Sequence, residues 1–301
     1  MPVKRQLRFV RDLVEPLRVA PGGAVDVRRD FDPGYTDGLS GKAEAASRLE
    51  EGISLLVDYQ DRLSAEGVHA VLLILQGLDG AGKDSTIKHV MAGVNPQWVQ
   101  VHSFKEPSSE ELAHDFLWRY QAAAPAHGRI GIYNRSQYEE VLVVRVHPEL
   151  LAAERLPDSP DTGLWSRRYR EINDWERYLV DNGTHVVKVL LNLSKEEQAR
   201  RFLRRIERPE KNWKFSPKDI RERQYWDDYR RAFDEMLSHT STEWAPWYVV
   251  PADHKWFARL ATAGILVRTL AEIDPQYPRP PSELLEEMDK AREALVAEAR
   301  G

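Results

Sequence analysis

Runs of consecutive apolar residues alternate with stretches of helical periodicity along most of the chain. The run Ala70–Gln76 (AVLLILQ) is apolar without alternation, which is typical of a central parallel strand covered on both faces. Similar runs follow at residues 98–104, 129–134, 184–193 and 247–250. These runs predict a parallel sheet of about five strands.

The segments around these runs predict helices. Over residues 42–66 the apolar positions Ala46, Leu49, Ile53 and Leu56 recur at helical spacing, and the segment ends at Gly67. Further helices are predicted at residues 83–92, 108–123, 136–151, 165–182, 195–207 and 217–238. Alternating strands and helices predict an α/β fold with a doubly wound sheet, whose ligands bind at the carboxyl ends of the strands.

Composition along the chain divides it into three segments. Residues 1–41 are rich in Gly, Pro, Asp and Arg without clear periodicity, and we expect an extended arm that lies on the core and carries no chemistry. Residues 42–275 form the core. The tail, residues 276–301, contains a charged helix over 282–299 whose apolar side fits either the core or a neighbouring subunit. We expect a homo-oligomer.

The overall composition is that of an ordinary cytoplasmic protein. The chain has 301 residues, 42% of them hydrophobic, and a net charge of -5. This charge gives no reason to expect binding to nucleic acid or to a membrane surface. It has no cysteine, which excludes disulfides and thiolate nucleophiles. The basic N-terminal residues could belong to a transit peptide, but Asp12 and Glu15 interrupt them and favour a solvated arm.

A phosphate-binding pattern follows the first strand. Residues 77–83 read GLDGAGK, the Walker A pattern G-x-x-x-x-G-K, between an apolar strand and a helix. The glycines let backbone N–H groups turn toward phosphate oxygens, and Lys83 places a charge at the transferred group. The pattern predicts a phosphotransferase whose phosphate-binding loop includes Gly77, Gly80, Ala81, Gly82, Lys83 and Ser85.

Acidic residues in and after this loop point to a metal. Asp84 stands where a Ser or Thr usually binds magnesium, and Asp79 lies within the loop. Carboxylates beside a polyanion repel it unless a cation lies between them, so we expect Mg²⁺ in the working site, with Mn²⁺ as a substitute. The alternative for Asp84 is that it only stabilises the positive end of the following helix.

A second polar cluster ends the predicted strand at 129–134. Asn134 occupies the place where the second magnesium carboxylate is expected in P-loop enzymes. We therefore assign that role to Glu139 or Glu140, favouring Glu140. The alternative is that both residues form an exposed acidic start of a helix.

A basic surplus marks a predicted lid at about residues 205–225. Between Arg200 and Arg231 the chain has twelve basic and six acidic residues, on two predicted helices joined by residues 209–217 (PEKNWKFSP). This arrangement predicts a mobile helical lid over the phosphate loop, although a solvated helix face would have a similar composition.

Several motifs taken together resemble the second polyphosphate kinase family, the polyphosphate:nucleotide phosphotransferases. They cover about residues 49–277 and read LLILQGLDGAGKDSTIKHV, SFKEPSSEELAHDFLWRY, IYNRSQYEEVLVVRV, RPEKNWKFSPKDIRERQYWDDY and APWYVVPADHKWFARL. The resemblance implies a three-layer α/β/α fold of the P-loop kinase type with a lid. It also implies Mg²⁺-dependent phosphoryl transfer between inorganic polyphosphate and adenine or guanine nucleotides.

The resemblance also implies roles for individual residues. Asp79 and Glu140 match the magnesium carboxylates, although the family often has Asp at the second position, and Lys83 and Arg135 match phosphate ligands. The implied catalytic residues are Lys83, Asp79, Arg135 and Asp84, and the implied nucleotide contacts are Asn134, Arg135 and Glu139. The implied lid contacts to polyphosphate are Arg204, Arg205, Arg208 and Lys214.

Two other functions remain open at this point. An ATP-dependent nucleoside monophosphate kinase has the same fold and differs in its donor, and a non-catalytic polyphosphate or nucleotide sensor would need no turnover. Retention of Gly77, Asp79, Lys83 and Arg135 together speaks against the sensor. The segment 134–140 is closer to family members that accept AMP as well as ADP, so we expect both acceptors.

Overall fold

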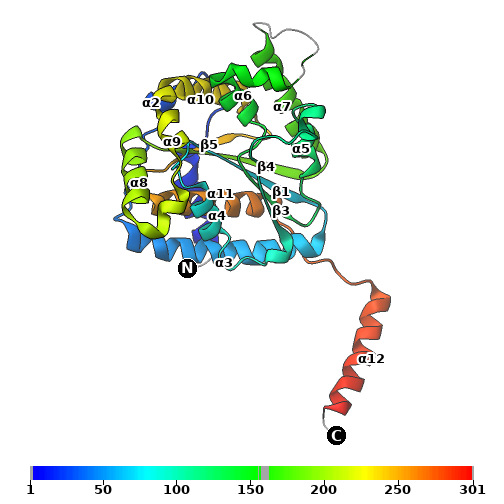
Figure 1. The fold of residues 1–301 in the computed structure, drawn as a ribbon. Helices are drawn as coiled ribbons and strands as arrows, with labels where there is room; N and C mark the ends of the chain where they lie inside the picture. Colours follow the sequence, from blue (N-terminus) through cyan, green and yellow to red (C-terminus); the bar gives the residue numbers. More distant parts are fainter. Residues whose placement is uncertain (1–2, 155, 157–162, 300–301) are drawn as a thin grey trace.

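The computed structural model describes residues 3–154, 156 and 163–299, so the outermost residues of the predicted arm and tail lie outside the described part. Its centre is a five-stranded sheet in the order β2-β3-β1-β4-β5, with every neighbouring pair parallel (Figure 1). The predicted strands are therefore confirmed. Their bounds are β1 (Ala70–Gln76), β2 (Val99–Ser103), β3 (Ile130–Asn134), β4 (Thr184–Asn192) and β5 (Trp247–Pro251).

Helices cover both faces of the sheet, which confirms the predicted three-layer α/β/α architecture. Successive residues of a strand face opposite sides, so Leu73 of β1 packs into one layer and Leu72 into the other. The layer around Leu73 contains α1 (Val3–Val14), α3 (Lys42–Glu66), α4 (Lys83–Val90) and α11 (Lys255–Ile273). The layer around Leu72 contains α5 (Trp118–Ala122), α6 (Glu139–Val146), α7 (Leu164–Asp181) and α10 (Trp226–Thr240).

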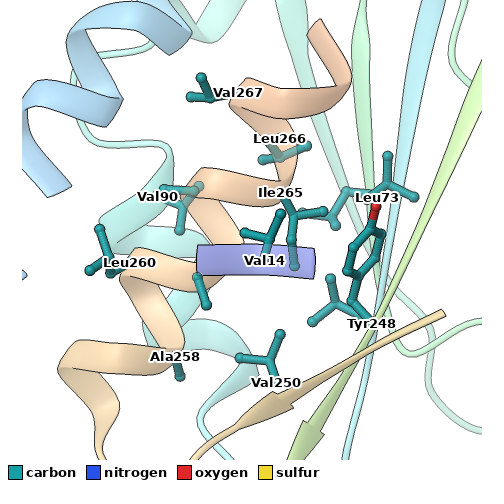
Figure 2. Packing of buried hydrophobic residues seen from close by; sticks show 14 of the residues in the cluster. Val14, Leu73, Val90, Tyr248, Val250, Ala258, Leu260, Ile265, Leu266 and Val267 are labelled. Atoms are coloured by element: carbon teal, nitrogen blue, oxygen red, sulfur yellow. The ribbon is translucent and has the colours of Figure 1, made fainter. Parts of the chain in front are cut away.

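The helix α11 was not predicted, because it has no polar face. Most of its residues are buried, and Figure 2 shows Ile265 and Leu266 packed beside Val14 of α1 and near the strands. A helix that is apolar on nearly all sides lacks the periodic pattern that marks an amphipathic helix. It nevertheless supplies much of the core on this face of the sheet.

The prediction of an extended arm over residues 1–41 is wrong in part. The segment begins with helix α1, whose Val10, Leu13 and Val14 are buried against α11. The short helices η1 (Glu15–Leu17) and α2 (Val27–Asp30) follow. Between them Val19 donates its backbone N–H to Trp247 of β5 at 2.8 Å, so the segment does lie on the core.

Three of the helices predicted between the strands are shortened or divided. The helix expected over 108–123 is reduced to a 3₁₀ turn, η3 (Glu111–Ala113), and the short α5. The one expected over 136–151 becomes α6 followed by η4 (Pro148–Ala153), which begins at a proline. The segment 217–238 divides into α9 (Pro217–Glu222), η6 (Arg223–Tyr225) and α10.

The lid segment predicted at about residues 205–225 begins within the last turn of helix α8 (Lys195–Glu207). Helix α8 is followed by η5 (Pro209–Lys214) and then α9. The tail helix α12 (Ser282–Glu298) extends away from the body of the molecule, and none of its residues is buried (Figure 1). None of the described helices combines the length and apolar character needed to cross a membrane.

Candidate active site

The loop between β1 and α4 is shaped by its glycines. Gly77, Gly80 and Gly82 have φ angles of 151°, 88° and 106°, in the region that only glycine adopts without strain. A Cβ atom at Gly80 would also lie 3.1 Å from the ring of Phe202. Because α4 begins directly after Gly82, the loop presents the N-terminal N–H groups of this helix at the carboxyl end of the sheet.

Lys83 lies inside this loop. Its side chain is 8% exposed, and Nζ donates to the carbonyl oxygen of Gly77 at 2.5 Å. Burial lowers the pKa of Lys83, and the nearby charge of Arg135 lowers it further, while Asp79 opposes both. The loop thus holds an amino group next to the backbone that would receive a phosphate.

Arg135 connects two carboxylates from different elements. Its Nη2 lies 2.6 Å from Oδ1 of Asp79, and its Nη1 lies 2.9 Å from Oε2 of Glu139. Burial disfavours the charged form of Asp79, but Lys83 and Arg135 outweigh burial and lower the pKa of this carboxyl. The charge of Glu139 in turn raises the pKa of Arg135. Asp79, Lys83, Arg135 and Glu139 therefore form one charged cluster, which brings together three of the four residues predicted to be catalytic.

Glu140 lies in a different environment from Asp79. Its Oε1 accepts from the hydroxyl of Tyr120 at 3.2 Å and lies 3.6 Å from Nη2 of Arg119, while Oε2 lies 4.0 Å from Nη1 of Arg168. Burial and the charge of Glu154 raise the pKa of Glu140 to about 7 in spite of these arginines. The predicted role of Glu140 at a metal beside Asp79 would require it to leave these partners, and the residue that the structure brings to the charged cluster is Glu139.

The remaining loop residues have partners on three other elements. Asn134 at the end of β3 donates to Oδ1 of Asp84 at 2.8 Å, and Lys214 of the lid lies 3.8 Å from Oδ2 of Asp84. Ser85 accepts from Nη2 of Arg259, on α11, at 2.8 Å. Asp84 therefore connects the end of β3 to the lid. These contacts go beyond the alternative interpretation, in which Asp84 only stabilises the start of α4.

Two of the predicted lid arginines are held by acidic residues. Arg204 lies 2.7 Å from Glu197, and Arg205 lies 3.0 Å from Asp219 of α9. Arg208 is the C-cap residue of α8. A cavity between the lid and the charged cluster is lined by residues that include Gly77, Asp79, Arg135, Glu139, Asp219 and Trp226.

Sequence reasoning missed two residues that hold the loop from the side of α8. Arg201 is 4% exposed and donates through Nη1 to the carbonyl oxygens of Gly80 and Ala81 at 2.9 and 2.8 Å. Gln198 donates to the carbonyl oxygen of Asp79 at 2.8 Å. The sequence feature that could have identified them is their spacing of three residues, which places both side chains on one face of α8. The positive charge of Arg201 did not distinguish it from the other basic residues nearby.

The donor set at the loop suits magnesium supplied with its substrate. Within the described residues no group of three or more His, Cys, Asp or Glu side chains is arranged to hold a metal alone. Mg²⁺ commonly binds one or two carboxylates together with substrate phosphates and water. Asp79 fits this pattern, because its lowered pKa keeps it ionised and its side chain is 37% exposed.

Comparisons with known proteins find relatives that match most of the chain. The family model described as Polyphosphate kinase 2 (PPK2) matches residues 39–278. The chain is 47% identical to an ADP-polyphosphate phosphotransferase of Rhodopseudomonas palustris, over 93% of this chain and 97% of that protein. It is 42% identical to an AMP/ADP-polyphosphate phosphotransferase of Meiothermus ruber, over 87% and 95%.

A solved structure extends the agreement to three dimensions. The crystal structure of polyphosphate kinase 2 from Arthrobacter aurescens superposes with a TM-score of 0.84 at 41% identity, and the match covers 94% of this chain and 96% of that one. Sequence, fold and relatives lead to the same assignment. The chain belongs to the polyphosphate kinase 2 family.

Proposed function

We propose that this protein transfers phosphoryl groups reversibly between inorganic polyphosphate and nucleotides, with both AMP and ADP as acceptors. The observation that carries the proposal is the charged cluster of Asp79, Lys83, Arg135 and Glu139, which lies between a glycine-shaped phosphate loop and a basic lid. The membership of the chain in the polyphosphate kinase 2 family also supports the proposal.

The chemistry requires positioning and charge neutralisation. A terminal phosphate oxygen of the acceptor attacks the end phosphorus of polyphosphate, and the bond from that phosphorus to the next bridging oxygen breaks. The shortened chain leaves with the bond electrons. Because the attacking oxygen is already anionic at neutral pH, no strong general base is needed. Lys83 and Arg135 bind the transferred phosphoryl group and balance its charge.

Asp79 would hold Mg²⁺ together with substrate phosphates, and Glu139 is a second carboxylate that shares the partner Arg135 with Asp79. Bound magnesium would supply charge neutralisation at the phosphate oxygens. Arg204, Arg205, Arg208 and Lys214 bind polyphosphate from the lid, and Asn134 contacts the nucleotide beside Asp84. We further propose that the protein acts in the cytoplasm as a homo-oligomer.

The choice of acceptors rests on the segment 134–140. The names of both relatives include ADP, and the name of one of them also includes AMP. One is called an ADP-polyphosphate and the other an AMP/ADP-polyphosphate phosphotransferase. Use of both acceptors needs a site that tolerates one phosphate more or less, and a lid that moves provides this tolerance.

The acceptor assay is a time course with polyphosphate, Mg²⁺ and AMP, in the presence of an adenylate kinase inhibitor. We expect ADP to appear first and ATP to follow in the same tube. Conversion of added ADP with AMP untouched would remove AMP from the proposal and leave the family intact. A requirement for ATP as the donor would instead favour an ATP-dependent nucleoside monophosphate kinase.

A further inference from the structure

The turn that carries Arg135 is anchored from behind by buried side chains. Between Arg135 and Glu139, which face the phosphate loop, the three residues Ser136, Gln137 and Tyr138 are all 0% exposed. Oγ of Ser136 accepts from Nε2 of Gln76 at 3.0 Å, and Gln76 is the last residue of β1 before the loop. The turn and the loop therefore share a buried contact.

The side chains of Gln137 and Tyr138 end on a single buried carboxylate. Oε1 of Glu176, on α7, accepts from the Tyr138 hydroxyl at 2.7 Å and from Nε2 of Gln137 at 3.0 Å. Its other oxygen accepts from Nζ of Lys188, on β4, at 2.6 Å. Lys188 also donates to the Tyr138 hydroxyl at 3.0 Å and to the carbonyl oxygen of Thr240 at 2.6 Å.

A buried ion pair of this kind is weak evidence of stability. Glu176 and Lys188 are both 0% exposed, and the cost of removing two charges from water often exceeds their attraction. Apolar residues of similar size would fill the space without that cost. What this pair does supply is a set of directional hydrogen bonds to the residues directly after Arg135.

Arg135 needs such support because its backbone is unusual. Its φ angle is 66°, in the left-handed region that residues with a Cβ atom seldom adopt. Conformations of this kind persist when the surrounding structure determines them, and they concentrate at functional sites. From this backbone conformation the guanidinium contacts both Asp79 and Glu139.

We propose that Glu176 and Lys188 are positioning residues of the transfer reaction: through Gln137 and Tyr138 they fix the turn that holds Arg135 against Asp79. Neither residue touches the phosphate loop. The inference rests on the proposed function, in which Arg135 binds the transferred phosphoryl group. Small displacements of a charged group at a reacting centre cost rate, so the effect belongs in kcat.

A double-mutant cycle tests this proposal. Tyr138→Phe removes the hydroxyl shared by Glu176 and Lys188, and Glu176→Gln/Lys188→Met removes both charges while keeping side-chain length. Each change is made in the wild type and in Arg135→Ala, and kcat, both KM values and Tm are measured. We expect kcat to fall by at least about fivefold in the wild-type background, with both KM values within about twofold. In Arg135→Ala we expect no further fall, because the changes act through Arg135.

Leu266→Ala on α11 is the stability control, since Leu266 is buried far along the chain from the turn. We expect it to lower Tm without lowering kcat when the assay is run well below Tm. If either buried change lowers kcat by the same factor with and without Arg135, or lowers Tm alone, the inference is overturned and the proposed function stands. If Arg135→Ala itself keeps wild-type turnover, the role of Arg135 in the proposed function falls, and the inference with it.

Discussion

Adjacent acidic residues at positions 139 and 140 have opposite surroundings. Glu139 pairs with Arg135 at the phosphate loop, whereas Glu140 is buried among Tyr120, Arg119 and Arg168. The sequence could place a carboxylate near this strand end, but it could not decide between neighbours one residue apart. That decision depends on how α6 is rotated at its first turn, which the packing of buried partners fixes.

The two carboxylates predict different responses to magnesium. We expect Glu139→Gln to raise the Mg²⁺ concentration that gives half-maximal rate by about tenfold, because the residue belongs to the charged cluster. A tenfold change corresponds to about 1.4 kcal/mol of binding free energy. Glu140→Gln should change this concentration by less than about twofold. Titration of activity against Mg²⁺ measures both, with Asp79→Asn as the positive control. The reverse order of effects would restore the magnesium role that the family resemblance gives Glu140.

Glu140 also predicts a pH dependence of stability. Its pKa rises from 4.5 to about 7 on folding because of burial, so the folded state binds this proton more tightly than the unfolded state does. The resulting stabilisation is fully present below pH 4.5 and is lost as the pH rises through 7. We expect the difference in unfolding free energy between wild type and Glu140→Gln to fall by up to about 3 kcal/mol over this range. Urea titrations at several pH values measure it, and a constant difference would contradict the raised pKa.

Among the elements, the strands were the most predictable and the buried helix α11 the least. A strand buried on both faces is a continuous apolar run bounded by polar residues, as β1 is. Helix α11 is also apolar on most sides, and its sequence offers no amphipathic stripe. The helix predicted over 108–123 failed for a local reason. Asp115 accepts from the N–H of Leu117 at 2.9 Å, which gives the chain a turn in place of a continuous helix.

The lid is the element whose function is most directly testable. Alanine at Arg204, Arg205 and Arg208 should raise KM for polyphosphate by about tenfold or more, because a linear polyanion has many charges to match. KM for the nucleotide should stay within about twofold, since its other contacts remain. The matched control replaces Arg29, Arg62 and Arg177, three arginines paired with nearby aspartates outside the lid. Equal effects on both substrates would favour the lid of an ordinary nucleotide kinase.

Helix α1 is expected to contribute to stability, because its apolar residues Leu7, Val10 and Val14 recur at helical spacing and face the core. Leu13 is 1% exposed and belongs to the core cluster beneath α11. We expect Leu13→Ala to lower the unfolding free energy by about 2–5 kcal/mol. Arg8→Ala on the exposed side of the same helix should change it by less than about 0.5 kcal/mol. Denaturant unfolding compares the two variants, and similar small effects would mean that α1 does not pack on the core.

At the scale of the whole molecule, the parallel sheet brings distant segments of sequence to one edge. The loop after β1, the turn after β3 and helix α8 after β4 meet there, which is why Asp79, Arg135 and Gln198 are neighbours. The phosphate loop and the cluster at residues 134–140 could be predicted, because each is a local pattern at a strand end. The contacts of Arg201, Glu176 and Lys188 could not, because they depend on tertiary packing between elements.

The central claim is that polyphosphate itself donates the phosphoryl group at this loop. The most direct measurement is ³¹P NMR of purified protein with Mg²⁺, ADP and long-chain polyphosphate, without added ATP, for the wild type and for Lys83→Met. We predict that ATP accumulates while polyphosphate is consumed in the wild type, and that the variant is slower by at least about a hundredfold with an unchanged Tm. Absence of ATP formation by the wild type, or wild-type rates in the variant, would contradict the account.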